Sequence, residues 1–163
     1  MADIVILGSG VFGLSLAIMC HNAGHNVTVW SKFQDEIDTI KRTGELKSKL
    51  SGVKIPKEIG LTTYITCVKD KNLIILGIPT AFSRSVCEEA AQYVIDDTIV
   101  VNTAKGLEKD TLKTMSEVTE ESFPNNKVAI LTGPSHAEEV ARGVPTTVVR
   151  AAKLIDVSYL VGY

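Results

Sequence analysis

The sequence has few cysteines and no excess of either charge. Its three cysteines are far apart and form no CxxC pair, which argues against a disulfide framework and against a zinc site. The 17 basic and 19 acidic residues give a net charge of −2, without the basic cluster that nucleic-acid binding requires. No apolar stretch approaches the ~20 residues that span a membrane, and no basic, cleavable leader precedes the first apolar run. We therefore expect a soluble cytoplasmic protein with no nucleic-acid partner, membrane span or metal.

The chain instead has a regular alternation of short apolar runs and helical patterns. Strands are expected at 3–7, 26–31, 61–66, 72–79, 98–102, 127–132 and 145–152, and helices at 11–24, 34–44, 81–94, 110–122 and 135–143. Residues 45–60 have no clear period and are expected to form a loop. This alternation predicts an α/β fold with a doubly wound, mostly parallel sheet of the Rossmann type, in one domain over residues 1–152.

A glycine-rich turn, GSGVFG, directly follows the first expected strand. Gly8, Gly10 and Gly13 have the GxGxxG spacing: the first permits a tight turn, the second lets a pyrophosphate approach the backbone, and the third lets helix and strand pack closely. Because the motif lies between a strand and a helix, it predicts dinucleotide binding rather than a purely structural turn.

The end of the second strand bears on the choice between NAD and NADP. An acidic residue about 20 positions after the glycines commonly holds the ribose hydroxyls of NAD. Here Ser31 and Lys32 follow the strand, and the first acids, Asp35 and Glu36, come later. A hydroxyl and an ammonium suit a 2′-phosphate, so we expect NADP to be at least tolerated. A solvated loop role for Lys32 is equally compatible with the sequence.

Two later strand ends also carry polar residues. Lys105 lies among small residues in NTAKGLE, where it can reach a substrate oxygen or phosphate through a charge-assisted hydrogen bond. The sixth strand ends in TGPSHAEEV, where Ser135 at a helix start could hold an anion. Ser135 and Glu138 also have the spacing of a capping box, which is a sufficient structural reason for the serine. Ligands of such sheets bind at this edge, so these residues are candidates for one site.

Four stretches together resemble the NAD(P)-dependent glycerol-3-phosphate dehydrogenases: GSGVFGLSLA, LSGVKIP, NTAKGLE and LTGPSHAEEVARGVPT. The last two are the most specific, and the resemblance extends from about residue 3 to residue 150. It implies that Lys105 contacts both cofactor and substrate. It further implies a cofactor role for Val11, Phe12, Lys32 and Ala137, and a substrate role for Gly133 and Ser135.

The family continues beyond this length into a helical second domain, which carries the lysine proposed as general acid/base. By this resemblance we expect no catalytic residue in the chain, with 153–163 the start of a missing or truncated C-terminal region. The chain alone is then expected to bind nucleotide with little or no turnover, because a cofactor half lacks the proton relay.

The function implied is NAD(P)H-dependent reduction of dihydroxyacetone phosphate to sn-glycerol 3-phosphate, a precursor of glycerophospholipids, by an oxidoreductase that is a homodimer at full length. One alternative is another two-domain dehydrogenase of related build, acting on a hydroxyacyl thioester or a sugar acid. Another is an isolated NAD(P)-binding sensor module, which would need the glycine turn but would give no reason for Lys105.

Overall fold

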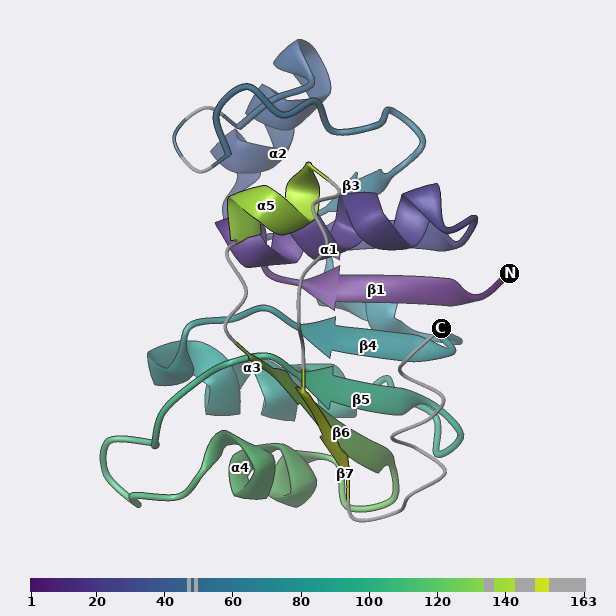
Figure 1. The fold of residues 1–163 in the computed structure, drawn as a ribbon. Helices are drawn as coiled ribbons and strands as arrows, with labels where there is room; N and C mark the ends of the chain where they lie inside the picture. Colours follow the sequence, from purple (N-terminus) through teal and green to yellow (C-terminus); the bar gives the residue numbers. More distant parts are fainter. Residues whose placement is uncertain (47, 49, 134–136, 143–148, 153–163) are drawn as a thin grey trace.

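A single sheet runs through the chain in the computed structural model, which describes residues 1–46, 48, 50–133, 137–142 and 149–152. Its strands lie in the order β3-β2-β1-β4-β5-β6-β7 (Figure 1). The strands are β1 (Asp3–Leu7), β2 (Asn26–Trp30), β3 (Gly60–Thr62), β4 (Leu73–Leu76), β5 (Ile99–Asn102), β6 (Lys127–Thr132) and β7 (Val149–Ala152). The helices are α1 (Val11–Asn22), α2 (Gln34–Thr43), α3 (Thr80–Ala91), α4 (Met115–Ser122) and α5 (Ala137–Ala141), with a 3-10 turn at Ile65–Val68. The order confirms the predicted doubly wound α/β fold.

Strands β1 to β6 are parallel to their neighbours, so their carboxyl ends lie along one edge. Strand β7 differs, because it pairs antiparallel with β6 from Thr132↔Val149 to Ala129↔Ala152. A parallel return needs a crossover that runs back along the sheet, whereas an antiparallel strand re-enters at the edge where its neighbour ended. Helix α5 packs against α1, and β7 starts beside Thr132, the last residue of β6.

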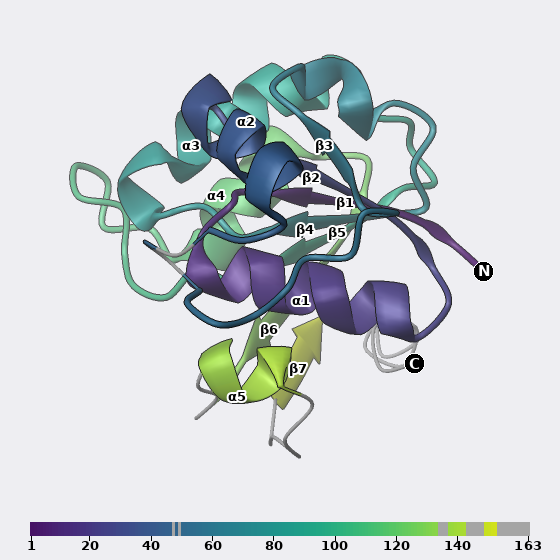
Figure 2. The ribbon, with the colours of Figure 1, turned by 90° about the horizontal axis from the view of Figure 1, so that it is seen from above.

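The sheet is covered on both faces, with α1 on one side and α3 and α4 on the other (Figure 2). Strand β1 shows the alternation: Ile4 and Ile6 pack in the cluster with α1, whereas Val5 and Leu7 pack in the cluster with α3 and with Phe123, which follows α4. Because both of its faces are buried, the central sheet consists of uniformly apolar runs. The longest helices, α1 and α3, have 12 residues each. Within the described part of the chain, no helix is long and apolar enough to cross a membrane.

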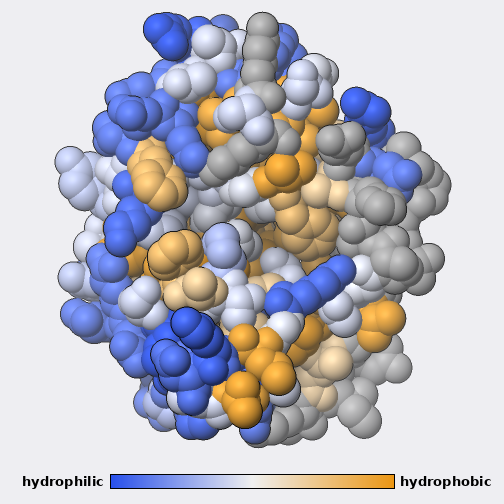
Figure 3. Space-filling model, turned by 90° about the vertical axis from the view of Figure 1, so that its left-hand side faces the viewer, coloured by the Kyte–Doolittle hydropathy of each residue, from blue (hydrophilic) through white to orange (hydrophobic). Residues whose placement is uncertain are grey.

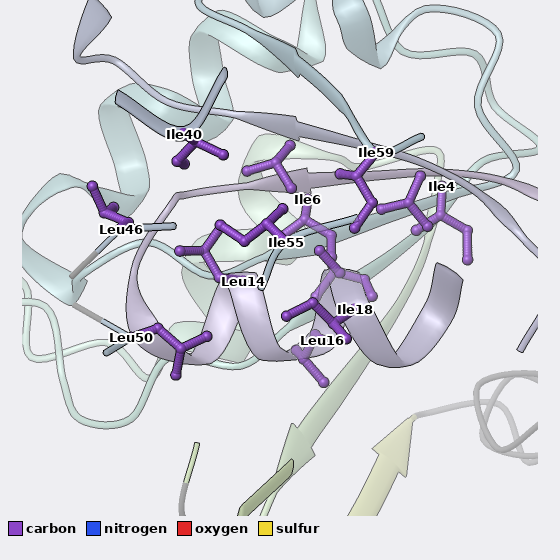
Figure 4. Close-up of a cluster of buried hydrophobic side chains, with 14 of the residues drawn as sticks. Ile4, Ile6, Leu14, Leu16, Ile18, Ile40, Leu46, Leu50, Ile55 and Ile59 are labelled. Atoms are coloured by element: carbon purple, nitrogen blue, oxygen red, sulfur yellow. The ribbon is translucent and has the colours of Figure 1, made fainter. Parts of the chain in front are cut away.

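Among the described residues of the expected loop 45–60, only the isolated bridge Leu46↔Leu50 and Gly60, the first residue of β3, have regular structure. The stretch nevertheless contributes to the core. Four of its side chains are at most 4% exposed and pack in the cluster with α1 (Figure 4): Leu46, Leu50, Ile55 and Ile59. This loop therefore covers the first helix, and its apolar residues follow the shape of the site they fill rather than a helical or strand period.

Most helices and strands begin or end within three residues of their predicted bounds, and α4 and β3 differ more. Helix α4 begins at Met115, because Thr114 forms a capping box with Glu117. Strand β3 ends at Thr62, since its partner β2 ends at Trp30, whose indole nitrogen donates to the Thr63 carbonyl at 2.9 Å. Strand β7 ends at Ala152, where the sequence places the domain boundary; that boundary stays a prediction, since residues 153–163 lie outside the described ones.

Candidate functional site

A pocket of about 750 Å³ opens at the carboxyl ends of the parallel strands, within the range of cofactor sites. Figure 3 views this side of the molecule and shows hydrophobic surface across its middle, with hydrophilic surface toward its left and lower edges. Residues from five strand ends line the pocket: Gly8, Gly10, Val11 and Phe12 after β1; Ser31, Lys32 and Phe33 after β2; Gly77, Ile78 and Pro79 after β4; Thr103, Ala104 and Lys105 after β5; and Leu131 and Thr132 at the end of β6.

The three motif glycines have different surroundings. A Cβ atom at Gly8 would lie 2.4 Å from the Gly77 carbonyl oxygen, and one at Gly13 would lie 2.3 Å from the Gly8 carbonyl oxygen. Both positions therefore exclude any side chain, and Gly8 also has a φ of 120°. At Gly10 a Cβ atom would meet only the Gly77 oxygen, at 3.8 Å, so this residue faces the open pocket. These surroundings match the motif's requirement that a ligand approaches the middle glycine closely.

Helix α1 begins directly at this turn and points its N-terminus toward the pocket. Its N-cap is Gly10, which provides no side-chain hydrogen bond, and its first turn contains no acidic residue. The first N–H groups of a helix lack partners within the helix and carry partial positive charge. Val11 and Phe12, the first two residues of α1, both line the pocket. The arrangement can hold an anion such as a pyrophosphate without any basic side chain.

The Glu36 carboxylate of α2 lies against the end of β2, a contact that the sequence did not predict. Ser31 is buried, and its hydroxyl donates to Oε2 of Glu36 at 2.9 Å. The hydroxyl oxygen of Ser9, the residue between the first two motif glycines, lies within hydrogen-bond distance of the same carboxylate oxygen and of the Ser31 hydroxyl. Lys32 is exposed at the pocket rim. The expected serine and lysine therefore both line the pocket, but the Ser31 hydroxyl is engaged with Glu36.

The ends of β5 and β6 meet through Lys105. Its ammonium nitrogen donates to the Gly133 carbonyl oxygen at 2.9 Å, although the two residues are 28 positions apart in sequence. Its own carbonyl accepts from the Thr80 hydroxyl at 3.0 Å, which ties this strand exit to α3. Lys105 is exposed at the same pocket as the glycine turn. An ammonium has three donors, so contact with Gly133 leaves capacity for a ligand oxygen.

An ion-pair group holds the segment after Lys105. The Arg84 guanidinium of α3 donates from Nε and Nη2 to the two oxygens of Glu108, at 2.7 and 2.8 Å. Arg84 also pairs with Glu121 of α4 at 3.0 Å, and Glu121 pairs with Lys113. Hydrogen bonds from Arg84 and Thr111 lower the pKa of Glu108 to about 2. The segment 105–113 is therefore tied to two helices by side-chain charges.

The structure brings most of the predicted residues to one site. Gly8, Gly10, Val11, Phe12, Ser31, Lys32, Lys105 and Ala137 all line the pocket. Gly13 is buried beneath the turn, and Gly133 contacts the site through Lys105. The Ala137 carbonyl accepts from the Ser15 hydroxyl of α1 at 2.6 Å. Ser135, with its expected capping box, lies outside the described residues.

Sequence analysis missed several residues that line the pocket. Phe33 and Phe82 do so although they are about 60% exposed, which apolar periodicity could not reveal. Gly77 packs against the turn, since a Cβ atom there would lie 3.3 Å from the Gly13 Cα. The sequence signal for this close contact was the position of Gly77 in LGIP, at the end of an apolar run.

Comparison with known proteins identifies relatives among the glycerol-3-phosphate dehydrogenases. The family described as NAD-dependent glycerol-3-phosphate dehydrogenase N-terminus matches residues 3–157. A glycerol-3-phosphate dehydrogenase [NAD(P)+] of Fusobacterium nucleatum is 43% identical over 155 residues, covering 93% of this chain and 46% of the relative. One from Agathobacter rectalis is 42% identical over 154 residues, with 94% and 46% covered. The chain thus spans about half the length of these relatives.

Solved structures show the same fold. The crystal structure of glycerol-3-phosphate dehydrogenase from Coxiella burnetii superposes with a TM-score of 0.91 at 25% identity, over 98% of this chain and 49% of that one. The structure of glycerol-3-phosphate dehydrogenase from Plasmodium falciparum superposes with a TM-score of 0.85 at 21% identity, over 98% of this chain and 48% of that one. The second likeness is one of fold alone.

Proposed function

Because the chain belongs to the family of NAD-dependent glycerol-3-phosphate dehydrogenase N-termini, we propose that it is the dinucleotide-binding half of an oxidoreductase. The proposed reaction is the reduction of dihydroxyacetone phosphate to sn-glycerol 3-phosphate with NADH or NADPH. The observation that carries the proposal is that the glycine turn and Lys105 line one pocket at the carboxyl edge of the sheet.

The residues present fit a nicotinamide dinucleotide. Gly10 leaves room for the pyrophosphate beside the uncapped start of α1, and Val11 and Phe12 supply backbone N–H groups there. Ser31 and Lys32 lie at the end of β2, where the adenosine ribose of such cofactors binds. The bound nicotinamide supplies the hydride for the ketone carbon. The largely apolar pocket wall limits the access of water to the reacting groups.

Lys105 is the proposed contact to the substrate. Its ammonium can donate to an oxygen of the substrate while it keeps its bond to Gly133, and a charge-assisted bond is about twice as strong as a neutral one. We propose that Gly133 and Ser135 complete the substrate contacts. The general acid/base then belongs to the part of the protein that the relatives possess beyond the length spanned here.

The wider role follows from the product. We propose that sn-glycerol 3-phosphate made in the cytoplasm supplies glycerophospholipid synthesis, and that the full-length enzyme is a homodimer. A nucleotide sensor would give no reason for an ammonium that bridges two strand exits at the pocket. The same observation is the reason to prefer an enzyme that binds a phosphorylated substrate.

The test uses Lys105→Met in the full-length product of the gene that encodes this chain. We expect kcat/KM for dihydroxyacetone phosphate to fall about 10- to 100-fold, the range for losing one charge-assisted hydrogen bond. The unfolding midpoint should remain unchanged because Lys105 is exposed. Lys109→Met is the matched control, since Lys109 is exposed in the same segment but does not line the pocket. Equal activity of the two variants would refute the role of Lys105. Failure of the unmodified protein to reduce dihydroxyacetone phosphate would refute the proposed reaction.

A further inference from the structure

A buried hydrogen-bond group joins the glycine turn to the end of β2. Ser9 is 5% exposed and Ser31 is 2% exposed, and both hydroxyls donate to Oε2 of Glu36. The two serines also contact each other, with 2.9 Å between their oxygens. Glu36 lies in the first turn of α2, five residues after Ser31 and 27 residues after Ser9. The fold therefore brings the Glu36 carboxylate against the two segments that follow β1 and β2.

The ends of β1 and β2 form the adenosine end of a dinucleotide site in this fold. In Rossmann folds the residue at the end of the second strand, opposite the glycine turn, contacts the ribose 2′-substituent. Here that residue is Ser31, which has no charge, and its hydroxyl is directed to Glu36. Ser9, Ser31 and Lys32 line the pocket at this position. A 2′-phosphate bound there would meet the Lys32 ammonium at the rim and the Glu36 carboxylate behind the serines.

We propose that Glu36 is a specificity-determining residue that disfavours the 2′-phosphate of NADPH relative to the 2′-hydroxyl of NADH. This inference rests on the proposed function of the pocket as a dinucleotide site. Glu36 and Lys32 act in opposite directions: the carboxylate repels a 2′-phosphate, and the ammonium attracts it. Ser31, which follows β2, does not set the preference between NADH and NADPH by itself. Its hydroxyl instead holds the Glu36 carboxylate of α2 in place.

A purely structural role for Glu36 predicts a different result. If the carboxylate only anchored α2 to the glycine turn, its replacement would weaken both dinucleotides together. Glutamine keeps the length of the side chain and an oxygen that accepts from the serines, so Glu36→Gln removes the charge and retains the hydrogen bonds. Asp35→Asn is the matched control, because it removes one negative charge from the same turn at an exposed position, whereas Glu36 is half-buried.

The experiment measures dissociation constants of NADH and NADPH by fluorescence titration for the unmodified chain and both variants. For Glu36→Gln we expect NADPH to bind about threefold more tightly, because the removed charge lies behind the serines and acts through a water-like dielectric. NADH should change by less than about twofold, and Asp35→Asn should leave the ratio unchanged. The fragments 2′,5′-ADP and 5′-AMP serve as further probes, because the expected difference between them resides in the adenosine end.

The outcomes separate this inference from the function on which it rests. An unchanged NADPH-to-NADH ratio in Glu36→Gln, or an equal change in Asp35→Asn, would overturn the role of Glu36 while leaving the pocket a dinucleotide site. Failure of the unmodified chain to bind either dinucleotide would overturn the proposed function itself. Thermal unfolding monitors folding, and Glu36→Met provides a second uncharged variant should glutamine destabilise the turn; it must show the same tightening of NADPH.

Discussion

The two sides of the pocket are built by different means. On the side of β1, the glycine turn consists of backbone that packs against backbone, with the Gly8 and Gly77 carbonyls filling the space of two side chains. On the side of β5, the segment that follows Lys105 is exposed and is held by Arg84, Glu108 and Glu121. The first side therefore depends on shape, and the second depends on side-chain charge and on pH.

This difference determines which perturbations each side tolerates. Close backbone packing leaves no room for one additional methyl group, because folded interiors are packed as densely as organic crystals. An exposed ion-pair group instead tolerates changes of volume but responds to protonation and to salt. In the proposed function, the closely packed side of β1 binds the cofactor, and the side of β5, which is held by ion pairs, binds the substrate.

The largest effect is expected when a methyl group is added beneath the turn. In Gly13→Ala the new Cβ would lie 2.3 Å from the Gly8 carbonyl oxygen, so the turn and α1 must separate. We expect the free energy of unfolding to fall by about 3 kcal/mol, at the upper end for overpacking. Urea unfolding followed by circular dichroism measures the change. Gly10→Ala is the control, and equal stability of the two variants would contradict the packing argument.

The same methyl group at Gly10 is expected to act on binding rather than on folding. Its nearest neighbour would be the Gly77 oxygen at 3.8 Å, an ordinary contact, so the free energy of unfolding should change little. The methyl would project into the pocket at the point of pyrophosphate approach. We expect the affinity for NADH to fall at least about tenfold, which is about 1.4 kcal/mol. Unaltered NADH affinity in a fluorescence titration would place the pyrophosphate elsewhere.

Acid should act selectively on the side of β5. The folded-state pKa of Glu108 is lowered to about 2 by the Arg84 and Thr111 hydrogen bonds, whereas an unfolded glutamate titrates near about 4.3. Its contribution to stability is therefore complete above about pH 4.3 and is lost as the pH falls toward 2. Glu108→Gln should lose stability less steeply over this range, measured as the urea midpoint against pH. Glu58→Gln, at an exposed position on another loop, should follow the unmodified protein.

The smallest effect is expected at the pocket rim. Lys32 is exposed, so its attraction for a 2′-phosphate is screened by water and salt. We expect Lys32→Ala to weaken NADPH binding about threefold at low salt, to leave NADH unchanged, and to lose this difference as the salt concentration rises. Titrations at two salt concentrations test it. Equal weakening of both dinucleotides would show that Lys32 does not contact the 2′-position.

Local sequence was sufficient for most of the elements and for the glycine turn. The apolar runs predict the strands because both faces of the sheet are buried, and the GxGxxG spacing predicts three roles that agree with the surroundings of Gly8, Gly10 and Gly13. The start of α4 after its N-cap Thr114 could also have been predicted from the capping-box pattern TMSE, whereas the helical period alone did not locate it.

The sequence by itself determined the α/β class, the strand edge that carries the site and the family. Each follows from patterns that are local in the sequence, which are short apolar runs, the glycine turn and short motifs. Only the tertiary structure decided that Glu36 meets Ser9, that Arg84 meets Glu108, that Lys105 meets Gly133 and that β7 is antiparallel. These contacts join residues from separate strands, helices or loops. They arise because parallel strands bring their ends to one edge, where long side chains reach partners that no local pattern specifies.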